Sequence, residues 1–213
     1  MEGGAPGRAA TGFAPPFHMI HGMTDATLSA DTCPGCGVHY PPWTGPTHAY
    51  IGATAACWAT YTALNAGGEP DPELIRRSVV ARPVTASGKE DPGIAANMFV
   101  DAYAAQHHGI EERRAIQSVA IHLIVLHGVF ARGKKPAEAM WIRVRVLRNR
   151  GGAFHWLTPP PMGEALSVRH LFPGGGVVEV ASRADYVRSV YETWGRLHGA
   201  QIDEWYERFV LSD

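Results

Sequence analysis

The sequence contains a cysteine pair at metal-ligand spacing, Cys33-Pro34-Gly35-Cys36-Gly37. Two thiolates three residues apart can bind one ion at about 2.3 Å, and the glycine after the second lets backbone N–H groups point at the sulfurs. The chain has only three cysteines in 213 residues, which excludes a disulfide framework. A redox dithiol of the thioredoxin type needs a strand before the pair and a helix directly after it, whereas prolines follow here. We therefore expect one zinc ion per chain, since zinc prefers soft ligands in a tetrahedral arrangement.

The cysteine pair supplies only two ligands, so two more must come from elsewhere in the chain. His48, just before a predicted helix, and Cys57, in the first turns of that helix, are close along the sequence. Together with Cys33 and Cys36, His48 and Cys57 would form a closed Cys3His site, and His39 is a further candidate very close to the cysteine pair. Two alternatives stay open: His107 could replace His48 or Cys57, and Cys57 could be a small buried apolar residue.

The remainder of the chain reads as mainly α. Helix-forming residues or apolar residues at helical spacing, with Gly and Pro at the ends, predict helices over 53–66, 71–80, 92–108, 111–132, 136–150 and 182–211. A strand is the second interpretation of the alternating string IRVRV, and a lone short strand is expected at 177–180. We expect one helical, bundle-like domain over 33–213, with a loop-rich CxxC metal knuckle at 33–57. Residues 1–32, rich in Gly, Ala, Pro and Thr, predict a flexible N-terminal arm.

Composition limits the possible partners. Lys plus Arg is 19 and Asp plus Glu is 20, so the net charge of -1 excludes a globally basic nucleic-acid binder. The longest apolar run, 119–131, is shorter than the roughly 20 residues that a membrane span needs, and no secretory segment is visible. We expect a soluble, cytoplasmic protein without a nucleic-acid or membrane partner. The apolar stripe of the last helix is core, or the seam of a homodimer.

A second cluster of polar residues flanks Gly109, where two predicted helices meet. If these helices form an antiparallel hairpin, Asp101 faces Ser118 and His122, which share one helix face because they lie four residues apart. A carboxylate beside an imidazole fixes its tautomer and increases its basicity, as a general base or a metal ligand requires. The competing interpretation is a buried histidine whose hydrogen bonds are satisfied by Asp or Ser.

Two further histidines are candidates. His107 is near the turn, roughly 15 Å along the helix axis from the level of His122, and is either a functional group or a cation at a helix C-terminus. His155, between Phe154 and Trp156, could supply a ligand or an acid–base group, or could simply pack against the core. Asp101, His107 and His122 are therefore the candidate catalytic residues. The motifs of dinucleotide-binding, phosphate-loop, esterase and zincin sites are absent from the sequence.

Several strings together resemble an uncharacterised bacterial family, a domain of unknown function. They are CPGCG, GPTHAYIGATAACW, VDAYAAQHHG, RRAIQSVAIHL and FHWL, and the resemblance runs from about Cys33 to the C-terminus. The family pattern is CPGC, THPY, Cys-Trp, DxYxxQHPG, SVxxHL and HW. Ala49 and His108 stand where that pattern has prolines. The resemblance implies that the matching residues act as one constellation, and it implies no substrate.

Two functions are compatible with these features. The first is a zinc-binding, metal-dependent enzyme acting on a small molecule, in which the metal polarises a carbonyl or activates water and Asp101 and His122 transfer protons. The alternative is a binding or structural module in which zinc staples the N-terminal loops to the helices. A coordination count separates them, because an open position favours catalysis and four protein ligands favour a structural role.

Overall fold

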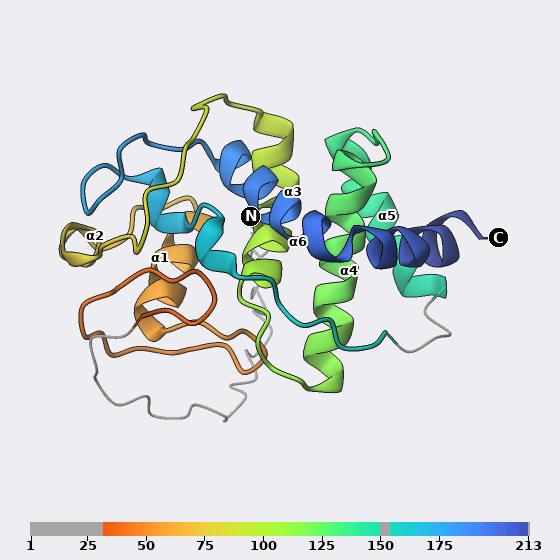
Figure 1. Cartoon of the computed structure of the whole chain (residues 1–213), viewed down its shortest axis with the longest axis horizontal. Coiled ribbons are helices and arrows are strands. Elements are labelled where there is room, and N and C mark those ends of the chain that lie inside the picture. Colours follow the sequence, from red (N-terminus) through yellow and green to blue (C-terminus); the bar gives the residue numbers. More distant parts are fainter. Residues whose placement is uncertain (1–31, 150–153, 213) are drawn as a thin grey trace, which may run out of the picture.

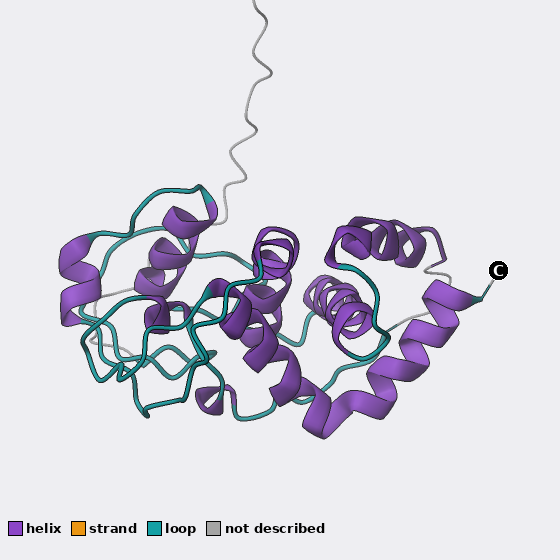
Figure 2. Cartoon of the chain, turned by 90° about the horizontal axis from the view of Figure 1, so that it is seen from above, coloured by secondary structure: helices purple, strands orange, loops and turns teal. Residues whose placement is uncertain are grey.

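The protein is seen here as a computed structural model that describes residues 32–149 and 154–212. Six α-helices follow one another along the chain: α1 (Ala55–Asn65), α2 (Pro72–Arg77), α3 (Pro92–Gln106), α4 (Arg113–Phe130), α5 (Ala139–Asn149) and α6 (Arg183–Tyr206). Short 3-10 helices lie at Pro136–Glu138, Met162–Glu164 and Val168–Leu171, and a π-helical turn, Glu207–Leu211, continues α6. The mainly α fold class is thus confirmed (Figures 1 and 2).

Local sequence explains where the helices begin. The side chains of Thr54, Asp71, Asp91 and Ser182 each accept a hydrogen bond from a backbone N–H in the first turn of the helix that follows. Such N-caps satisfy donors that have no partner inside the helix. Proline occupies the first position of α2 and α3, where its missing N–H costs nothing.

The helix predicted over 136–150 is confirmed as α5, whereas the one strand that we expected is not found within the described residues. The string IRVRV lies inside α5, because its apolar side chains also recur at helical spacing and Ile142 and Val146 are buried. The lone strand expected at 177–180 does not form: Val177 makes only an isolated bridge to Gly174 within a tight turn. The predicted N-terminal arm, residues 1–32, falls outside the described residues except for Thr32.

The core lies where α3, α4 and α6 pack together, with α5 on the far side of α4 (Figure 1). The buried residues here include Met98, Leu123, Ile124, Val187 and Trp194. α4 and α5 approach each other closely at Gly128, where an added Cβ would lie 2.5 Å from Ile142 Cδ1. The close packing of α4 against α5 therefore requires a glycine at position 128.

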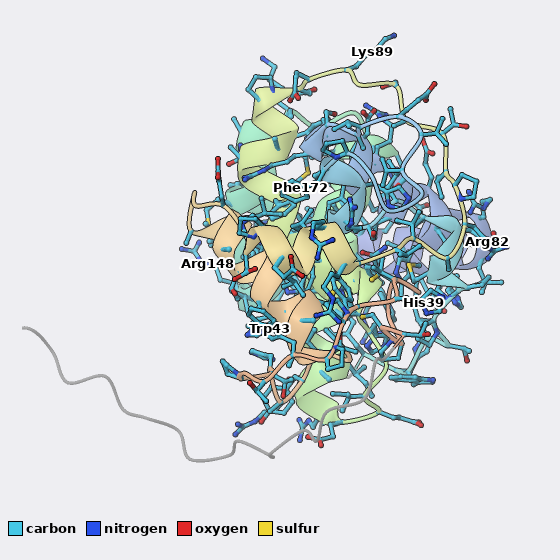
Figure 3. The ribbon with its side chains drawn as sticks, turned by 90° about the vertical axis from the view of Figure 1, so that its left-hand side faces the viewer. His39, Trp43, Arg82, Lys89, Arg148 and Phe172 are labelled. Carbon is cyan, nitrogen blue, oxygen red and sulfur yellow. The ribbon has the colours of Figure 1, made fainter. Side chains whose placement is uncertain are left out.

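Loops and short helices form the other half of the molecule, around α1 and α2 (Figures 1 and 2). His39 pairs with Val79 through two backbone hydrogen bonds of 2.8 Å, which joins the segment before α1 to the segment after α2. Figure 3 views this side, where His39 and Trp43 project from the chain that leads into α1. None of the helices in the described parts of the chain is both long enough and apolar enough to traverse a bilayer.

Candidate metal centre and ligand pocket

The CxxC segment forms a tight turn. Gly37 N–H donates to the Cys33 carbonyl and Cys33 N–H donates to the Val38 carbonyl, both at 2.8 Å. Gly37 has a φ of 72°, a conformation that glycine adopts without steric cost. A Cβ at Gly35 would lie 2.3 Å from Cδ2 of His107, so only glycine lets this imidazole approach the turn.

The other two members of the cluster come from helix ends. Cys57 occupies the first turn of α1, where its backbone N–H is capped by the Thr54 side chain at 3.3 Å. His107 is the C-cap residue of α3, and its carbonyl accepts a hydrogen bond from Gly52 N–H at 2.8 Å. Two helix ends and one turn thus converge on a single point.

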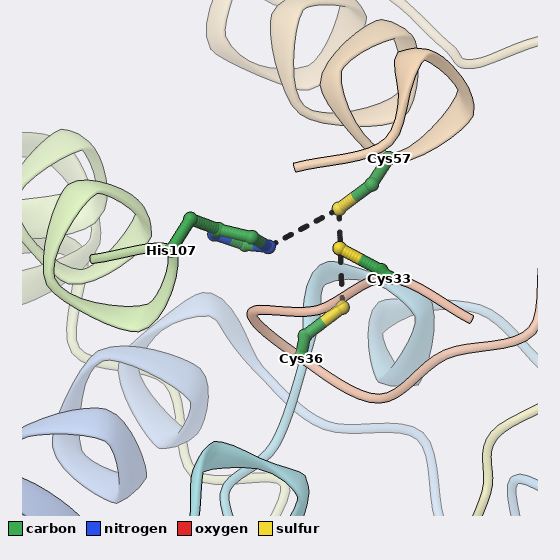
Figure 4. Close-up of side chains that lie close together, drawn as sticks. All are labelled: Cys33, Cys36, Cys57 and His107. Carbon is green, nitrogen blue, oxygen red and sulfur yellow. Dashed lines mark hydrogen bonds between the residues drawn. The ribbon is translucent and has the colours of Figure 1, made fainter. Parts of the chain in front are cut away.

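Cys33, Cys36, Cys57 and His107 lie together with all ligand atoms within 4.8 Å of one another (Figure 4). Cys57 Sγ is 3.9 Å from Cys36 Sγ and 3.3 Å from His107 Nε2. All four side chains are buried, with at most 4% exposed, and all three thiols are free. The cluster could hold a metal ion, because it combines three sulfurs and one imidazole nitrogen in the set that tetrahedral sites use.

Neighbouring groups fix the orientation of these ligands. Nδ1 of His107 lies 2.8 Å from the Tyr103 carbonyl, which can only accept, so Nδ1 carries a proton and Nε2 is the nitrogen turned toward the sulfurs, free to coordinate an ion once it has lost its own proton. The Tyr103 hydroxyl donates to Cys57 Sγ at 3.4 Å. Hydrogen bonds of this kind orient ligands in metal sites.

The ionisable groups of the cluster shift one another's pKa values in different directions. Hydrogen bonds from Cys36 and Cys57 hold the pKa of Cys33 well below its ordinary value, whereas burial raises the pKa of Cys36 well above it. Burial alone would lower the pKa of His107, but the Cys57 and Cys33 thiolates outweigh it and raise the pKa to about 10. Binding a divalent cation would release protons from these groups, since the ligands must be deprotonated.

His48, expected as the fourth ligand, lies outside this group, and His107 stands in its place. The His48 side chain is turned to its own loop, where Nδ1 accepts a hydrogen bond from Tyr50 N–H at 3.2 Å and the ring packs against Trp58. His107, expected as a catalytic residue, is therefore a candidate metal ligand. His155 is exposed and packs edge-on against Trp205, away from the cluster.

The hairpin of α3 and α4 brings Asp101 and His122 together, as the sequence predicts. His122 Nδ1 lies 2.5 Å from Asp101 Oδ1, and Ser118 Oγ lies 3.3 Å from His122 Nε2. Asp101 is fully buried, and Arg143 of α5 also donates to its Oδ1, at 2.7 Å. Its second oxygen, Oδ2, has no hydrogen-bond partner among the described residues.

A cavity of about 210 Å³ borders this pair at His122. His122 and Ser118 line one side of it, and Tyr103, which also contacts Cys57, lines another. The other walls are mostly aromatic: His48, Tyr50, Trp58 and Tyr61, with Ile51, Val100, Ala104 and Val119. A concave, largely apolar site with a few converging polar groups is the usual form of a small-molecule site.

Two parts of this site were not predicted from the sequence. Arg143 is one of several basic residues of α5, and no local pattern indicates that it reaches Asp101. The aromatic walls come from segments of α1 and α3 whose rings meet only in the fold, such as Tyr61 and Tyr103, which stack with centroids 3.7 Å apart. The aromatic residues that lie near Cys57 and Asp101 in the sequence were the signal that could have indicated these walls.

Fold and site together define a mainly helical protein with a buried Cys3His cluster that could bind a metal. Residues 80–195, more than half of the chain, match a family described as a family of unknown function, DUF5946, and the chain belongs to this family. The matched residues include Asp101, His107 and His122, and the three cysteines lie before them. No curated protein and no solved structure matches the chain.

Proposed function

We propose that the protein binds one zinc ion through Cys33, Cys36, Cys57 and His107, and that this ion has a structural role. The observation that carries the proposal is the closed set of four buried ligand atoms within 4.8 Å. Structural zinc sites have four protein ligands, whereas catalytic sites keep a position open for water or substrate. The sulfur-rich ligand set favours zinc over the harder cations magnesium and calcium.

In this role the ion would join three parts of the chain that are far apart in the sequence. Cys57 and His107 are 50 residues apart, and Cys36 and Cys57 are 21 apart. The ion would hold the CxxC turn against α1 and the end of α3, and thereby shape the wall of the aromatic cavity that Tyr103 lines. Its binding energy would add directly to the stability of the fold.

Metal analysis of single variants tests this assignment. Protein purified without chelator should contain about one zinc per chain, and His107→Ala should lose the metal together with roughly 10 °C or more in Tm. His48→Ala is the matched control, because His48 is exposed and lies outside the cluster. Loss of zinc from His48→Ala but not from His107→Ala would refute the ligand set.

A second function is supported by the pair Asp101–His122 beside the aromatic cavity. We propose that the protein is an enzyme acting on a small molecule, with His122 as the group that transfers a proton and Asp101 as the residue that positions it. The support is the 2.5 Å contact between a fully buried carboxylate and an imidazole that remains 12% exposed. In this arrangement the reacting group is His122, so the closed metal site need not contact the substrate.

Ligand-induced thermal shifts across a metabolite panel test the enzyme proposal. A ligand of the cavity should raise the Tm of the wild type, and the shift should be lost in Trp58→Ala, which removes one wall. The control is Trp141→Ala, since Trp141 is a half-exposed tryptophan on α5 outside the cavity. A panel without any hit, or shifts that Trp58→Ala leaves intact, would contradict a ligand site here.

A further inference from the structure

Ser118, His122 and Asp101 form a continuous line of hydrogen-bonding groups that ends in the aromatic cavity. Ser118 Oγ lies 3.3 Å from His122 Nε2, and His122 Nδ1 lies 2.5 Å from Asp101 Oδ1. We propose that these three residues are a nucleophilic triad and that Ser118 accepts the acyl group of a small, uncharged ester. This inference rests on the role proposed above for His122 and adds the nucleophile, the reaction and the substrate class.

The proton positions follow from the chemistry of the partners. An ionised carboxylate can only accept, so Nδ1 of His122 carries the hydrogen that points to Asp101. Nε2 then presents its lone pair to Ser118, whose hydroxyl can donate to it. This is the order of roles in serine, histidine and aspartate triads, which recur on unrelated folds and are recognised by geometry. Arg143, 2.7 Å from the same Asp101 oxygen, places a positive charge against the carboxylate.

The location of Ser118 suits a nucleophile. It is exposed on α4, one helical turn before His122, and both residues line the cavity. A serine whose only role was to satisfy a buried histidine would not need access to a cavity. The 3.3 Å separation is longer than a strong hydrogen bond, as is common for catalytic contacts without a bound substrate.

The cavity indicates the substrate class. Its aromatic walls and volume of about 210 Å³ suit an acyl group no larger than a single ring, without charge. The Tyr61 hydroxyl makes no hydrogen bond to the described part of the chain, although the residue is 5% exposed. Burial and Asp101 raise the pKa of Tyr61 to about 12, so this hydroxyl stays protonated and can donate to the carbonyl oxygen of a bound ester.

The reaction balances with water as the only co-substrate. Ser118 Oγ attacks the ester carbonyl carbon while His122 Nε2 takes the hydroxyl proton, and a bond forms between Oγ and the acyl carbon. The bond to the alcohol oxygen then breaks, and His122 returns the proton to the leaving alcohol. A water molecule, activated by the same nitrogen, hydrolyses the acyl-serine to a carboxylic acid and free Ser118.

Another histidine on α4 provides an internal comparison. His127 lies 2.7 Å from Asp203, but its second ring nitrogen accepts from the Tyr191 hydroxyl at 3.1 Å. Asp203 is also paired with Arg132 at the surface. No serine of the described segments hydrogen-bonds to the ring of this second histidine, so the pair should be inert in the chemistry proposed for His122.

Labelling with diisopropyl fluorophosphate tests the proposal on the full-length, zinc-loaded protein. Intact-mass and peptide analysis should show one phosphoryl group per chain on Ser118, with fluoride as the leaving group. Ser118→Ala should abolish the label, and His122→Gln should slow it by about 10²-fold or more. His127→Gln should leave the rate unchanged. Ser87 is the matched serine, because it contacts the carboxylate of Asp185 on an exposed loop but no imidazole.

Asp101 requires a separate readout because its loss could also disturb folding. Asp101→Asn should reduce the labelling rate by at least about 10²-fold, and Asp101→Glu should restore part of it, at a Tm close to that of Asp101→Asn. Equal rates for the two variants would show that the carboxylate does not position His122. With 4-nitrophenyl acetate, the wild type should also release a burst of nitrophenolate that Ser118→Ala lacks.

The possible results separate this inference from the function proposed above. An unlabelled wild type overturns the triad. So does a label on Ser118 that forms no faster than a label on Ser87 and at a rate that His122→Gln does not change. If that protein still contains zinc and gives thermal shifts that depend on Trp58, the earlier proposals stand. Since Ser118 is exposed, Ser118→Ala should fold. If it does not, the peptide map of the labelled wild type decides, and a label elsewhere overturns the inference.

Discussion

His107 Nε2 lies 3.3 Å from Cys57 Sγ, although 50 residues separate them along the chain. Each comes from the end of a helix, Cys57 from the first turn of α1 and His107 from the C-cap of α3. Their meeting completes the cluster that the CxxC turn begins, and it places Tyr103 between the cluster and the aromatic cavity. The Cys3His cluster and the aromatic cavity are therefore neighbours, and Tyr103 contacts both.

The first prediction concerns Gly35, the residue that admits His107 to the turn. In Gly35→Ala the new Cβ would lie 2.3 Å from His107 Cδ2, so the imidazole must move away from the sulfurs. We expect zinc affinity to fall by roughly 10- to 100-fold and stability by about 1–3 kcal/mol, measured by chelator competition and urea denaturation. Gly109→Ala is the control, because its Cβ would meet nothing within 4 Å. Equal zinc affinities in the two variants would contradict the close approach of His107.

The second prediction concerns the tautomer of His122. Because Asp101 accepts from Nδ1, neutral His122 should carry its proton on Nδ1, with Nε2 free for Ser118. Long-range ¹H–¹⁵N correlation spectra of the protein at alkaline pH should show this tautomer. Asp101→Asn should change the pattern, since an amide can donate as well as accept. A wild-type ring protonated on Nε2 would mean that the pair is not oriented as described.

The third prediction concerns His170, a buried histidine in the loop-rich half. Burial, with a smaller effect of Arg169, lowers the pKa of His170 to about 4. The unfolded chain therefore binds this proton first, and stability falls as the pH drops below the unfolded value of about 6.5 towards 4. The contribution is at most roughly 3 kcal/mol.

Urea denaturation at several pH values measures this effect. His170→Asn is the informative variant, because an amide oxygen can still accept from Ser167 N–H as the ring nitrogen does at 3.0 Å. The wild type should lose more stability than His170→Asn between pH 7 and pH 4.5, with both proteins compared in their zinc-free form. Parallel stability curves would show that His170 titrates normally in the folded protein.

Much of this architecture could be predicted from sequence because its signals are local. N-cap residues, prolines at first helical positions and the apolar spacing in α4 define helix limits within a few residues. The contact between Asp101 and His122 also follows from local geometry, since a hairpin around Gly109 fixes which positions face each other. The strand expected at 177–180 failed because three glycines at 174–176, all at positive φ, form a turn there instead.

The fourth ligand could not be chosen from sequence because the choice depends on long-range packing. His48 is nearer to the cysteines along the chain. In the fold, however, Gly52 N–H donates to the His107 carbonyl, and Gly35 leaves room for the His107 ring. Neither contact has a sequence signature. The same holds for Arg143, which reaches Asp101 from α5 across 42 residues.

X-ray absorption spectroscopy of the purified protein tests the proposed ligand set Cys33, Cys36, Cys57 and His107, because it counts the ligand types around the metal. We expect a zinc edge with about three sulfurs near 2.3 Å and one nitrogen near 2.0–2.1 Å, and the nitrogen contribution should disappear in His107→Ala. His48→Ala should leave the spectrum unchanged. A shell with two sulfurs, a bound water in the fourth position, or a nitrogen that depends on His48 would contradict this ligand set.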